Sequence, residues 1–562
     1  MVFIALASIV AIGAALRFHG LTYGLPAVYN PDETPILNRA LAFAKGDLNP
    51  HNFLYPSLDF YALFFWEGLF FASGHLVGVF PSLSAFQQEF FSNPSRIFLA
   101  GRAMTAVVGT LTIPAVYAAG RRLYDRGIGL AAALFLAVAP IAARDAHYIK
   151  LDVPVTFVLV LTFIVLADLV RTPVSGSPRA WLLAGFLGGL TISTHYYAAF
   201  VVLPIAAAVV SARPAGWTTV LRRGLWAASA LIVGFLVGTP FIIVEPATAI
   251  RDIVAVRQID VDRAVVHGAF TSLLPYLRLL MVDAVGWPVA IAAAAGLVWA
   301  TIADWRRGLL LLSFVLPFLA FVSNTVPQTR YLNVLLPLLA IAAAYCLVSL
   351  ARVLTDRSRA LAALLVAAAA VPGAIACVRT DAFILQDDTR TLALRFIEDH
   401  VPAGATILEQ PYSVPLRQTR EVLIDALRAH LGSERNASIK FQLQLDVHPW
   451  PSPAYRVLYL GRGGEDVDKI YLSPDAFRMA GLETLRQYKV DYVVLKRYNV
   501  DDPAMQPLIS TLERGGRMIA AFSPYRGNSA ARDVPPFLHN TAARISPALD
   551  RPGPIVQVWR IN

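Results

Sequence analysis

Charge is what this 562-residue chain has least of: only 15% of its residues are Asp, Glu, Lys or Arg, while 56% are hydrophobic. A soluble globular protein carries about a quarter charged residues. The deficit is confined to the region before about residue 378, where long apolar runs are separated by short breaks. From Arg379 onward the composition is that of an ordinary water-soluble protein. We therefore predict a polytopic α-helical membrane domain over residues 1–378 and a soluble α/β domain over residues 379–562.

Cysteine and the common catalytic motifs are also scarce. Cys346 and Cys377 are the two cysteines, and both lie in apolar runs, so no disulfide framework is expected. No P-loop, nucleophile elbow, HExxH motif or paired CxxC is present, which leaves ATP coupling and zinc-protease chemistry without support. The net charge of +10 comes from arginines in short loops rather than from one basic face. It therefore indicates membrane topology and not nucleic-acid binding.

Apolar runs of the length that a membrane helix needs recur along the first two thirds of the chain. We predict about 11 to 13 spans in total. The candidate spans are residues 2–18, 97–119, 127–144, 152–170, 180–196, 197–212, 224–244, 284–303, 308–324, 331–350 and 360–378. A further apolar run at 58–80 contains Asp59, Glu67 and His75, and we predict that it lies along the interface instead of crossing.

The arginines predict an orientation, because basic clusters occupy every second loop of this arrangement. The positive-inside rule makes those loops cytoplasmic. The remaining loops are then extracytoplasmic, and so is the C-terminal domain, which we expect to be periplasmic. The loops predicted outside are 30–96, 144–152, 195–197, 245–283 and 324–331.

Two adjacent acids, Asp32 and Glu33, follow the first predicted span within the segment Tyr29-Asn30-Pro31-Asp32-Glu33-Thr34. Acids near a lipid boundary are costly to desolvate and suggest a function. One interpretation is that Asp32 caps the helix that begins near Thr34. The other is that Asp32 is a general base that takes a proton from an acceptor hydroxyl.

The second outer loop, Arg144 to Pro154, is dense in polar groups. It contains His147, Lys150 and Asp152 beside Arg144, and Lys150 is one of only two lysines before residue 379. These side chains could be solvated charges that reach toward the interface. Alternatively, Arg144 or Lys150 faces a phosphate, and Asp152 orients that cation or binds the acceptor.

Two further predicted outer segments carry candidate substrate-binding residues. His195 lies in the tight turn between two spans, where it is either a satisfied interfacial residue or a donor to a phosphate or sugar hydroxyl. Arg330 and Tyr331 open a late span. An arginine at the outer end of a span opposes the positive-inside bias, so it requires an anionic partner, either a local acid, a lipid head group or a lipid phosphate.

Evidence for a cofactor is weak. Asp260-Val261-Asp262, before His267, is a D-x-D pattern, and hard divalent cations do prefer clustered carboxylates. Solvated pairs of acids on loops are far more common. A divalent metal is therefore possible without being supported by a specific motif, and we predict no metal ligands.

These segments together resemble the GT-C membrane glycosyltransferases, in particular the bacterial branch related to protein O-mannosyltransferases and lipid A aminoarabinose transferases. The resemblance covers the membrane half of the chain. It rests on the order of segments 30–34, 101–102, 120–123, 147–154, 189–196 and 330–332. One departure is that the aminoarabinose branch has a Glu-Lys pair where this chain has Phe53-Leu54-Tyr55-Pro56, which puts an aminoarabinose donor and a metal held by that Glu in doubt.

The resemblance implies a function and roles for these residues. Asp32 would be the catalytic residue, supported by Glu33, and the reaction would be an inverting transfer of sugar from a polyprenyl-phosphate donor. Arg330 and Tyr331 would contact the donor phosphate, and the other candidate substrate contacts are Lys150, Asp152, His147, His195 and Tyr55. The acceptor is left open among a glycan, a lipid and a protein. The alternatives are a transporter or flippase for lipid-linked glycans and a non-catalytic binder of them.

The C-terminal region alternates helical and extended patterns, which predicts an α/β or α+β domain. A helix is expected over 388–400. Strands are expected over 405–409, 455–460, 490–495, 518–522 and 555–561. Tyr412, Trp450 and Tyr525 are either exposed aromatic residues for a sugar or, more commonly for such residues, part of the core.

Overall fold

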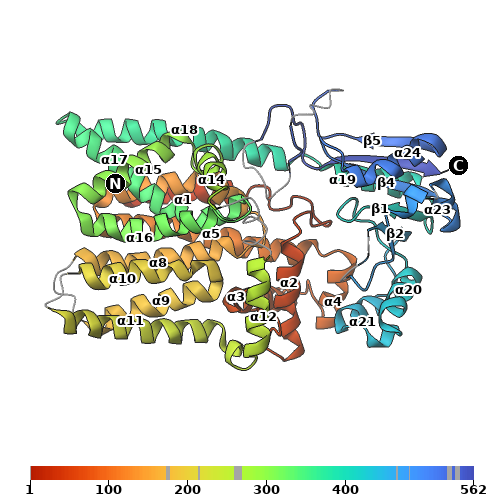
Figure 1. Cartoon of the computed structure of the whole chain (residues 1–562), viewed down its shortest axis with the longest axis horizontal. Helices are drawn as coiled ribbons and strands as arrows, with labels where there is room; N and C mark the ends of the chain where they lie inside the picture. The colour runs from red at the N-terminus through yellow and green to blue at the C-terminus, as the bar shows by residue number, and fades with distance from the viewer. Residues whose placement is uncertain are drawn as a thin grey trace.

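The computed structural model describes residues 2–171, 177–212, 216–258, 269–461, 463, 466–479, 481–527, 534–537 and 545–561. Asp260, Asp262 and His267 lie outside the described residues. The chain forms a long helical bundle at one end and a six-stranded sheet with its helices at the other, with the N-terminus in the bundle and the C-terminus in the sheet (Figure 1).

Each of the apolar runs predicted as a span coincides with a helix or a broken helix. These elements are α1 (Val2–Phe18), α5 (Ser95–Leu123), α6 (Arg126–Ala137) with α7 (Pro140–Asp145), α8 (Asp152–Arg171), α9 (Pro178–Thr194), η2 (Tyr196–Val201) with α10 (Val202–Ser211), α11 (Trp217–Gly238), α14 (Leu273–Leu279) and η5 (Leu280–Ala284) with α15 (Trp287–Ala303), α16 (Trp305–Val322), η6 (Thr329–Leu335) with α17 (Leu336–Leu354), and α18 (Ser358–Ile384).

Six helices in the described part of the chain are long and apolar enough to cross a membrane. A seventh span results if the segment Leu273–Ala284 and helix α15, which meet at 120°, are one span. Helices α1 and α6 and the segment Tyr196–Ser211 are apolar but shorter. The number of 11 to 13 spans stays a prediction.

Glycines allow α9 and α11 to pack backbone against backbone. A Cβ atom added at Gly185 would lie 2.0 Å from the Ala227 carbonyl oxygen, and one at Gly189 would lie 2.1 Å from that of Leu231. On the facing helix, a Cβ at Gly234 would lie 2.2 Å from the Phe186 carbonyl oxygen. Such close approach through small residues is typical of helix pairs in membranes.

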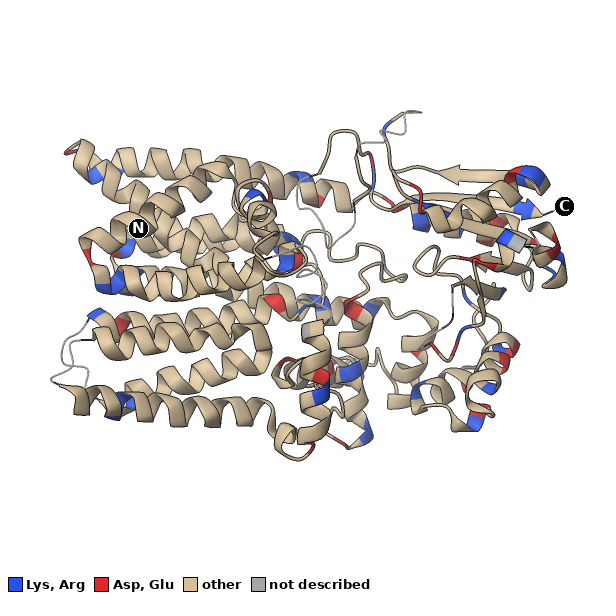
Figure 2. Cartoon of the chain, in the orientation of Figure 1, with Lys and Arg blue, Asp and Glu red and all other residues tan. Residues whose placement is uncertain are grey.

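The helix ends that flank the basic loops lie together at the end of the bundle away from the sheet (Figure 1). Arg122 at the end of α5 pairs with Asp168 on α8 at 3.2 Å, and Arg352 on α17 pairs with Asp125 before α6 at 2.7 Å. Figure 2 shows that the long helices are almost without charged residues along their length. Charge is therefore placed at helix ends, as a bilayer requires.

Helices between the bundle and the sheet form a separate layer. They are α2 (Glu33–Ala42), η1 (Phe43–Lys45), α3 (Leu58–Leu76), α4 (Leu83–Ser92), η3 (Pro240–Ile243) and α12 (Pro246–Arg257). In Figure 1, α2 and α12 run across the direction of the bundle, and α3 packs against α2 and α5. Phe43, Phe60, Phe80 and Ile97 form part of the apolar core of this layer.

The C-terminal sheet has the strand order β3-β2-β1-β4-β6-β5. Its strands are β1 (Thr406–Glu409), β2 (Arg456–Leu460), β3 (Tyr471–Leu472), β4 (Tyr492–Arg497), β5 (Gly516–Phe522) and β6 (Ile555–Ile561). Strands β1 to β4 pair in parallel, whereas β6 pairs antiparallel with β4 and β5. Each of the five predicted strands overlaps an observed one, and the predicted helix 388–400 is α19 (Thr389–His400).

Helices cover both faces of this sheet. Apolar side chains of α19 share a core with one face of β1, β2 and β4. Residues from the segment 477–512 share a core with the other face. The further helices are α20 (Arg420–Leu431), η7 (Glu434–Asn436), α21 (Ile439–Leu445), α22 (Ala476–Met479), α23 (Leu482–Gln487), η8 (Pro503–Met505) and α24 (Gln506–Gly515).

Candidate active site

A small polar cavity brings together predicted residues from five distant parts of the sequence. It has a volume of about 130 Å³. It lies at the start of α2 and α8, beside the α9–η2 turn and η6. Six of the nine predicted site residues line it. The lining residues are Pro31, Asp32, Pro35, Ile36, Arg39, Tyr55, Lys150, Leu151, Asp152, His195 and Arg330.

Asp32 and Arg330 form an ion pair across this cavity. The distance from Arg330 Nη1 to Asp32 Oδ2 is 2.9 Å, and the two side chains are 17% and 26% exposed. Asp32 occupies the N-cap position of α2, but its carboxylate accepts no capping hydrogen bond. The side chain of Asn30 instead accepts a bond from the Asp32 amide at 3.1 Å. The Asp32 carboxylate therefore does not cap the helix. It pairs with Arg330 instead.

Glu33, the neighbouring acid, is fully buried and does not line the cavity. Both of its oxygens accept hydrogen bonds from Arg102 on α5, at 2.7 Å each. Arg102 also donates to the Leu21 and Tyr23 carbonyls at 2.6 and 2.7 Å. The amide of Ile149 donates to Glu33 at 3.1 Å. Glu33 thus joins the chain before α2 to α5 and to the segment that carries Lys150.

Lys150 and Asp152 line the same cavity and are almost fully buried. Lys150 Nζ is 3.6 Å from Asp145, and the Tyr197 hydroxyl donates to Asp152 at 2.9 Å. Arg144, the other candidate cation of this loop, does not line the cavity. It donates to Asp145 at 2.9 Å and to Thr329 at 2.7 Å, so it supports the wall from behind.

His195 separates the polar cavity from a neighbouring apolar one. Its ring stacks on Tyr197 with centroids 3.8 Å apart and meets Tyr55 edge-on at 5.3 Å. The second cavity has a volume of about 360 Å³ and shares His195 with the first. Tyr331 lines this second cavity rather than the first. The lining residues are Leu54, His195, Tyr196, Tyr197, Phe200, Ile253, Val256, Phe321, Thr325 and Tyr331.

His147 lies away from both cavities. It is buried, and its two ring nitrogens are 2.9 Å from the Ala143 carbonyl oxygen and 2.7 Å from that of His19. Asp381 on α18 is 3.7 Å from the ring. This geometry gives no support to the predicted contact between His147 and substrate, because both ring nitrogens are engaged inside the protein.

Arg39 lines the polar cavity although the sequence did not single it out. It lies on α2 seven residues after Asp32, and residues i, i+4 and i+7 share one face of a helix. Burial lowers the pKa of its guanidinium, opposed by Tyr55 and Asp252. The spacing from Asp32 was the signal that could have identified it.

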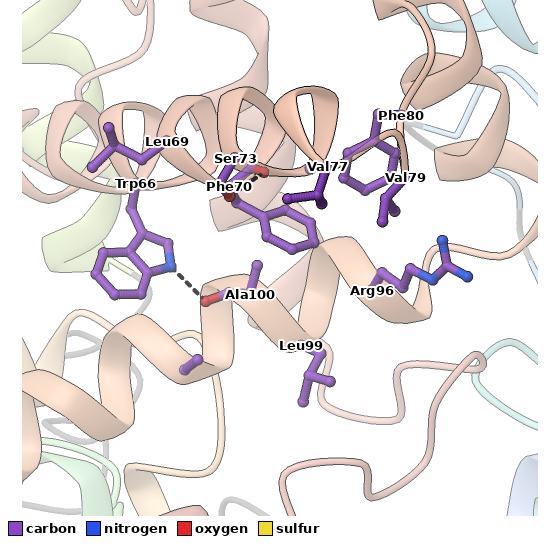
Figure 3. A pocket seen from close by; sticks show the side chains of 12 residues that line it. Trp66, Leu69, Phe70, Ser73, Val77, Val79, Phe80, Arg96, Leu99 and Ala100 are labelled. Carbon is purple, nitrogen blue, oxygen red and sulfur yellow. Dashed lines mark hydrogen bonds between the residues drawn. The ribbon is translucent and has the colours of Figure 1, made fainter.

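A much larger cavity of about 950 Å³ lies between α3 and α5 (Figure 3). Trp66 donates to the Ala100 carbonyl at 2.8 Å on one side of it, and Phe70 lines it between Trp66 and Phe80. Arg96 is the one charged residue among those that line it. Glu89, which lies 3.6 Å from Arg96, is not part of the lining. The other lining residues are apolar apart from Ser73, so this cavity is suited to apolar contacts and not to proton transfer.

No group of three or more His, Cys, Asp or Glu residues in the described ranges is arranged to hold a metal ion. The D-x-D pattern at 260–262 lies outside those ranges.

A protein-family model matches part of the chain. Residues 87–243, which include Lys150, Asp152 and His195, match the family model of dolichyl-phosphate-mannose-protein mannosyltransferases. No curated protein matches the chain by sequence.

Similar solved structures cover almost the whole chain. The crystal structure of ArnT from Cupriavidus metallidurans bound to undecaprenyl phosphate matches with a TM-score of 0.55 and 13% identity, over 98% of this chain and 97% of that one. The apo state of the same protein matches with a TM-score of 0.54 and 14% identity over the same shares. The partial family match and the shared fold support the resemblance to the GT-C membrane glycosyltransferases.

Proposed function

We propose that this protein transfers a sugar from a polyprenyl-phosphate-linked donor to an acceptor hydroxyl, with inversion, at the outer face of the cytoplasmic membrane. Asp32 is the general base. The observation that carries this proposal is the Asp32 carboxylate, which lies 2.9 Å from Arg330 in a small cavity that Lys150 and Asp152 also line. The match to a mannosyltransferase family named for a lipid-phosphate donor supports the donor class.

The reaction moves one proton and one glycosyl group. The acceptor hydroxyl attacks the anomeric carbon and gives its proton to Asp32. The bond between that carbon and the phosphate oxygen breaks, and the polyprenyl phosphate leaves with the electron pair. Cations fixed around the leaving group stabilise the charge that develops on it, and this stabilisation is large where water is scarce.

Arg330 has a specific role in this scheme, because it places a positive charge 2.9 Å from the carboxylate of the proposed base. A general base must lie within hydrogen-bond reach of the proton that it accepts. The pair also orients the carboxylate toward the cavity. An incoming acceptor hydroxyl can use the second carboxylate oxygen, Oδ1, since Arg330 is bonded to Oδ2.

The two adjoining cavities fit the two parts of a lipid-linked donor. The polar cavity offers cations to the phosphate and acids to sugar hydroxyls. The apolar cavity behind His195 offers Phe200, Ile253 and Val256 to the first part of the hydrocarbon chain. The bound ligand in the similar ArnT structure is undecaprenyl phosphate, which supports a ligand of this shape.

The proposed orientation follows from the charge distribution. The helix ends that flank the basic loops gather at the end of the bundle away from the sheet, and the positive-inside rule places that end in the cytoplasm. The polar cavity and the α/β domain of residues 379–562 are then extracytoplasmic, and residues 1–378 form the catalytic membrane domain. The helix α18 runs to Ile384 across this boundary.

The test is the substitution Asp32→Asn, which keeps the size of the side chain and removes the base. General-base catalysis contributes roughly 10²–10⁴-fold, so we expect transfer to fall by at least about 100-fold while the protein stays folded in the membrane. The measurement is mass spectrometry of surface glycans and polyprenyl-phosphate sugars in cells with the parent chain, the variant or neither. The donor should accumulate and one glycan should disappear.

A matched control is Asp47→Asn, because Asp47 is an exposed aspartate that bonds His51 outside the cavity. It should leave the glycan profile unchanged. Parent levels of the glycan in Asp32→Asn cells would remove the central claim. A flippase or a non-catalytic binder predicts that outcome, since neither needs a base.

A further inference from the structure

Arg39 differs from the other cations of the polar cavity in its partners. Arg330 pairs with Asp32 at 2.9 Å, and Lys150 lies 3.6 Å from Asp145. In the described part of the chain, no carboxylate pairs with Arg39. Its guanidinium lies near two aromatic rings, 6.0 Å from the centroid of Tyr55 and 5.7 Å from that of Phe60.

Asp252 is the acid that attracts Arg39 from a distance, but its oxygens are engaged elsewhere. One accepts the Phe53 amide at 2.8 Å, and the other accepts Arg251 at 2.9 Å. Asp152, the second acid of the cavity, accepts the Tyr197 hydroxyl. Arg39 is thus a half-buried cation whose charge no ion pair in the described structure balances.

The cavity as a whole carries an excess of positive charge. Its lining includes three cations, Arg39, Lys150 and Arg330, and two carboxylates, Asp32 and Asp152. Burying a charge without a partner is costly, so an arrangement of this kind favours an anionic ligand. A guanidinium presents a planar fork of N–H donors that matches a phosphate, and contact with aromatic rings holds that plane in place.

We propose that Arg39 binds the phosphate of the donor and stabilises it as the leaving group, while Arg330 stays paired with Asp32. This inference rests on the proposed function and adds the residue that recognises its donor. The two roles are divided between an arginine of α2 and an arginine of η6. As the bond to the anomeric carbon breaks, the charge on the phosphate increases, and Arg39 gains interaction energy at that moment.

Binding can be measured without turnover in the full-length parent protein held in lipid nanodiscs, because neither probe carries a sugar that could be transferred. The two probes are undecaprenyl phosphate and undecaprenol, which share a chain and differ in the phosphate. Hydrogen bonds to charged groups contribute roughly 1.5–3 kcal/mol, so Arg39→Gln should weaken undecaprenyl phosphate binding by about 10- to 100-fold. Binding of undecaprenol should not change, and Arg39→Lys should retain part of the preference for the phosphate.

The matched control is Lys45→Gln, because Lys45 is an exposed cation in the neighbouring turn η1 that does not line the cavity. It should bind both probes like the parent. Equal binding of undecaprenyl phosphate by Arg39→Gln and the parent would overturn the role of Arg39 alone. An equal loss for both probes would also overturn it, since that indicates a structural effect. A parent that does not prefer the phosphate over the alcohol would overturn the proposed donor class as well.

Discussion

At the scale of single residues, the neighbours Asp32 and Glu33 have opposite environments. Asp32 is partly exposed in the cavity, whereas Glu33 is fully buried in a two-pronged pair with Arg102. Successive helical residues point about 100° apart, so one acid can face substrate while the next one faces the core. Removing one partner of a buried pair leaves an uncompensated charge, which is far more costly than losing an exposed one.

We therefore expect Glu33→Gln to destabilise the fold by about 3–5 kcal/mol. The measurement is the Tm of the full chain in detergent, followed by tryptophan fluorescence. Asp32→Asn, measured in parallel, should keep a Tm near that of the parent because its side chain is partly exposed. A Glu33→Gln variant that melts with the parent but has lost transfer would show that Glu33 acts in the chemistry and not in the framework.

The predicted residues that the structure brings into one cavity are those whose chemistry is unusual for their place. Asp32, Lys150 and Arg330 are charged side chains next to lipid-spanning runs, where charge is costly, and all three line the cavity. His147 also lies next to a lipid-spanning run, but its ring nitrogens face backbone carbonyls. This could not be predicted, because a sequence does not give the direction of a side chain in a loop. Arg39 was missed because an arginine on a short amphipathic helix is ordinary.

At the scale of elements, α3 carries a buried acid on an apolar helix. Glu67 is 1% exposed, and neither carboxylate oxygen has a hydrogen-bond partner in the described structure. It packs against α5 where Gly101 leaves room, since a Cβ there would lie 3.2 Å from Glu67 Oε1. Burial raises the pKa of Glu67 to about 8. The folded chain thus holds this carboxyl in its neutral form near neutral pH.

The sign of the resulting pH effect follows from proton binding. Between the ordinary glutamate pKa of about 4.3 and the folded value of about 8, the folded state binds more protons than the unfolded state. The contribution of Glu67 to the free energy of unfolding is therefore complete below its unfolded pKa of about 4.3. It is lost as the pH rises through the folded pKa of about 8. We expect Glu67→Gln to raise the Tm relative to the parent at pH 8.5 and to change it much less at pH 4.5.

The control for this prediction is Glu89→Gln on α4, because Glu89 makes only a 3.6 Å contact with the largely exposed Arg96. It should not alter the pH dependence of the Tm. If the difference between Glu67→Gln and the parent were the same at both pH values, Glu67 would not be the group that titrates.

The type of each long element could be predicted, but breaks and short pieces could not. Apolar length identified the helices of the bundle, and alternation identified five strands. The division of the run 127–144 into α6 and α7, and the bend of 120° before α15, depend on packing between elements. Strand β3 has only two residues, which is too short for a pattern.

At the scale of the whole molecule, the α/β domain contacts the loop that carries Asp32. The Tyr23 hydroxyl donates to Asp388 at 2.9 Å, and the Tyr29 hydroxyl is 2.8 Å from that of Thr391. Arg390 lies over the Tyr29 ring, 3.8 Å from its centroid, and two of its nitrogens donate to Asp388 at 2.8 Å each. The first turn of α19 therefore holds the segment 23–29, which precedes the cavity directly.

We expect this contact to make the C-terminal α/β domain a positioning element for the proposed site. Arg390→Ala removes the group that packs on Tyr29, and the loop before Asp32 becomes freer to move. A shift of about 1 Å at a reacting group can cost about 100-fold in rate. We expect turnover to fall by about 10- to 100-fold, with a smaller change in the KM for the donor. Hydrogen exchange of the amides in segment 20–32 should become faster.

Arg395→Ala is the matched control for this contact. Arg395 lies on the same helix, but its pair with Asp387, at 2.7 Å, is between half-exposed side chains, and such pairs contribute little. It should leave both turnover and exchange unchanged. A variant Arg390→Ala with faster exchange and full turnover would mean that the α/β domain orders the loop without setting the position of Asp32. Unchanged exchange would mean that the contacts of Tyr23 and Thr391 are sufficient to hold the loop.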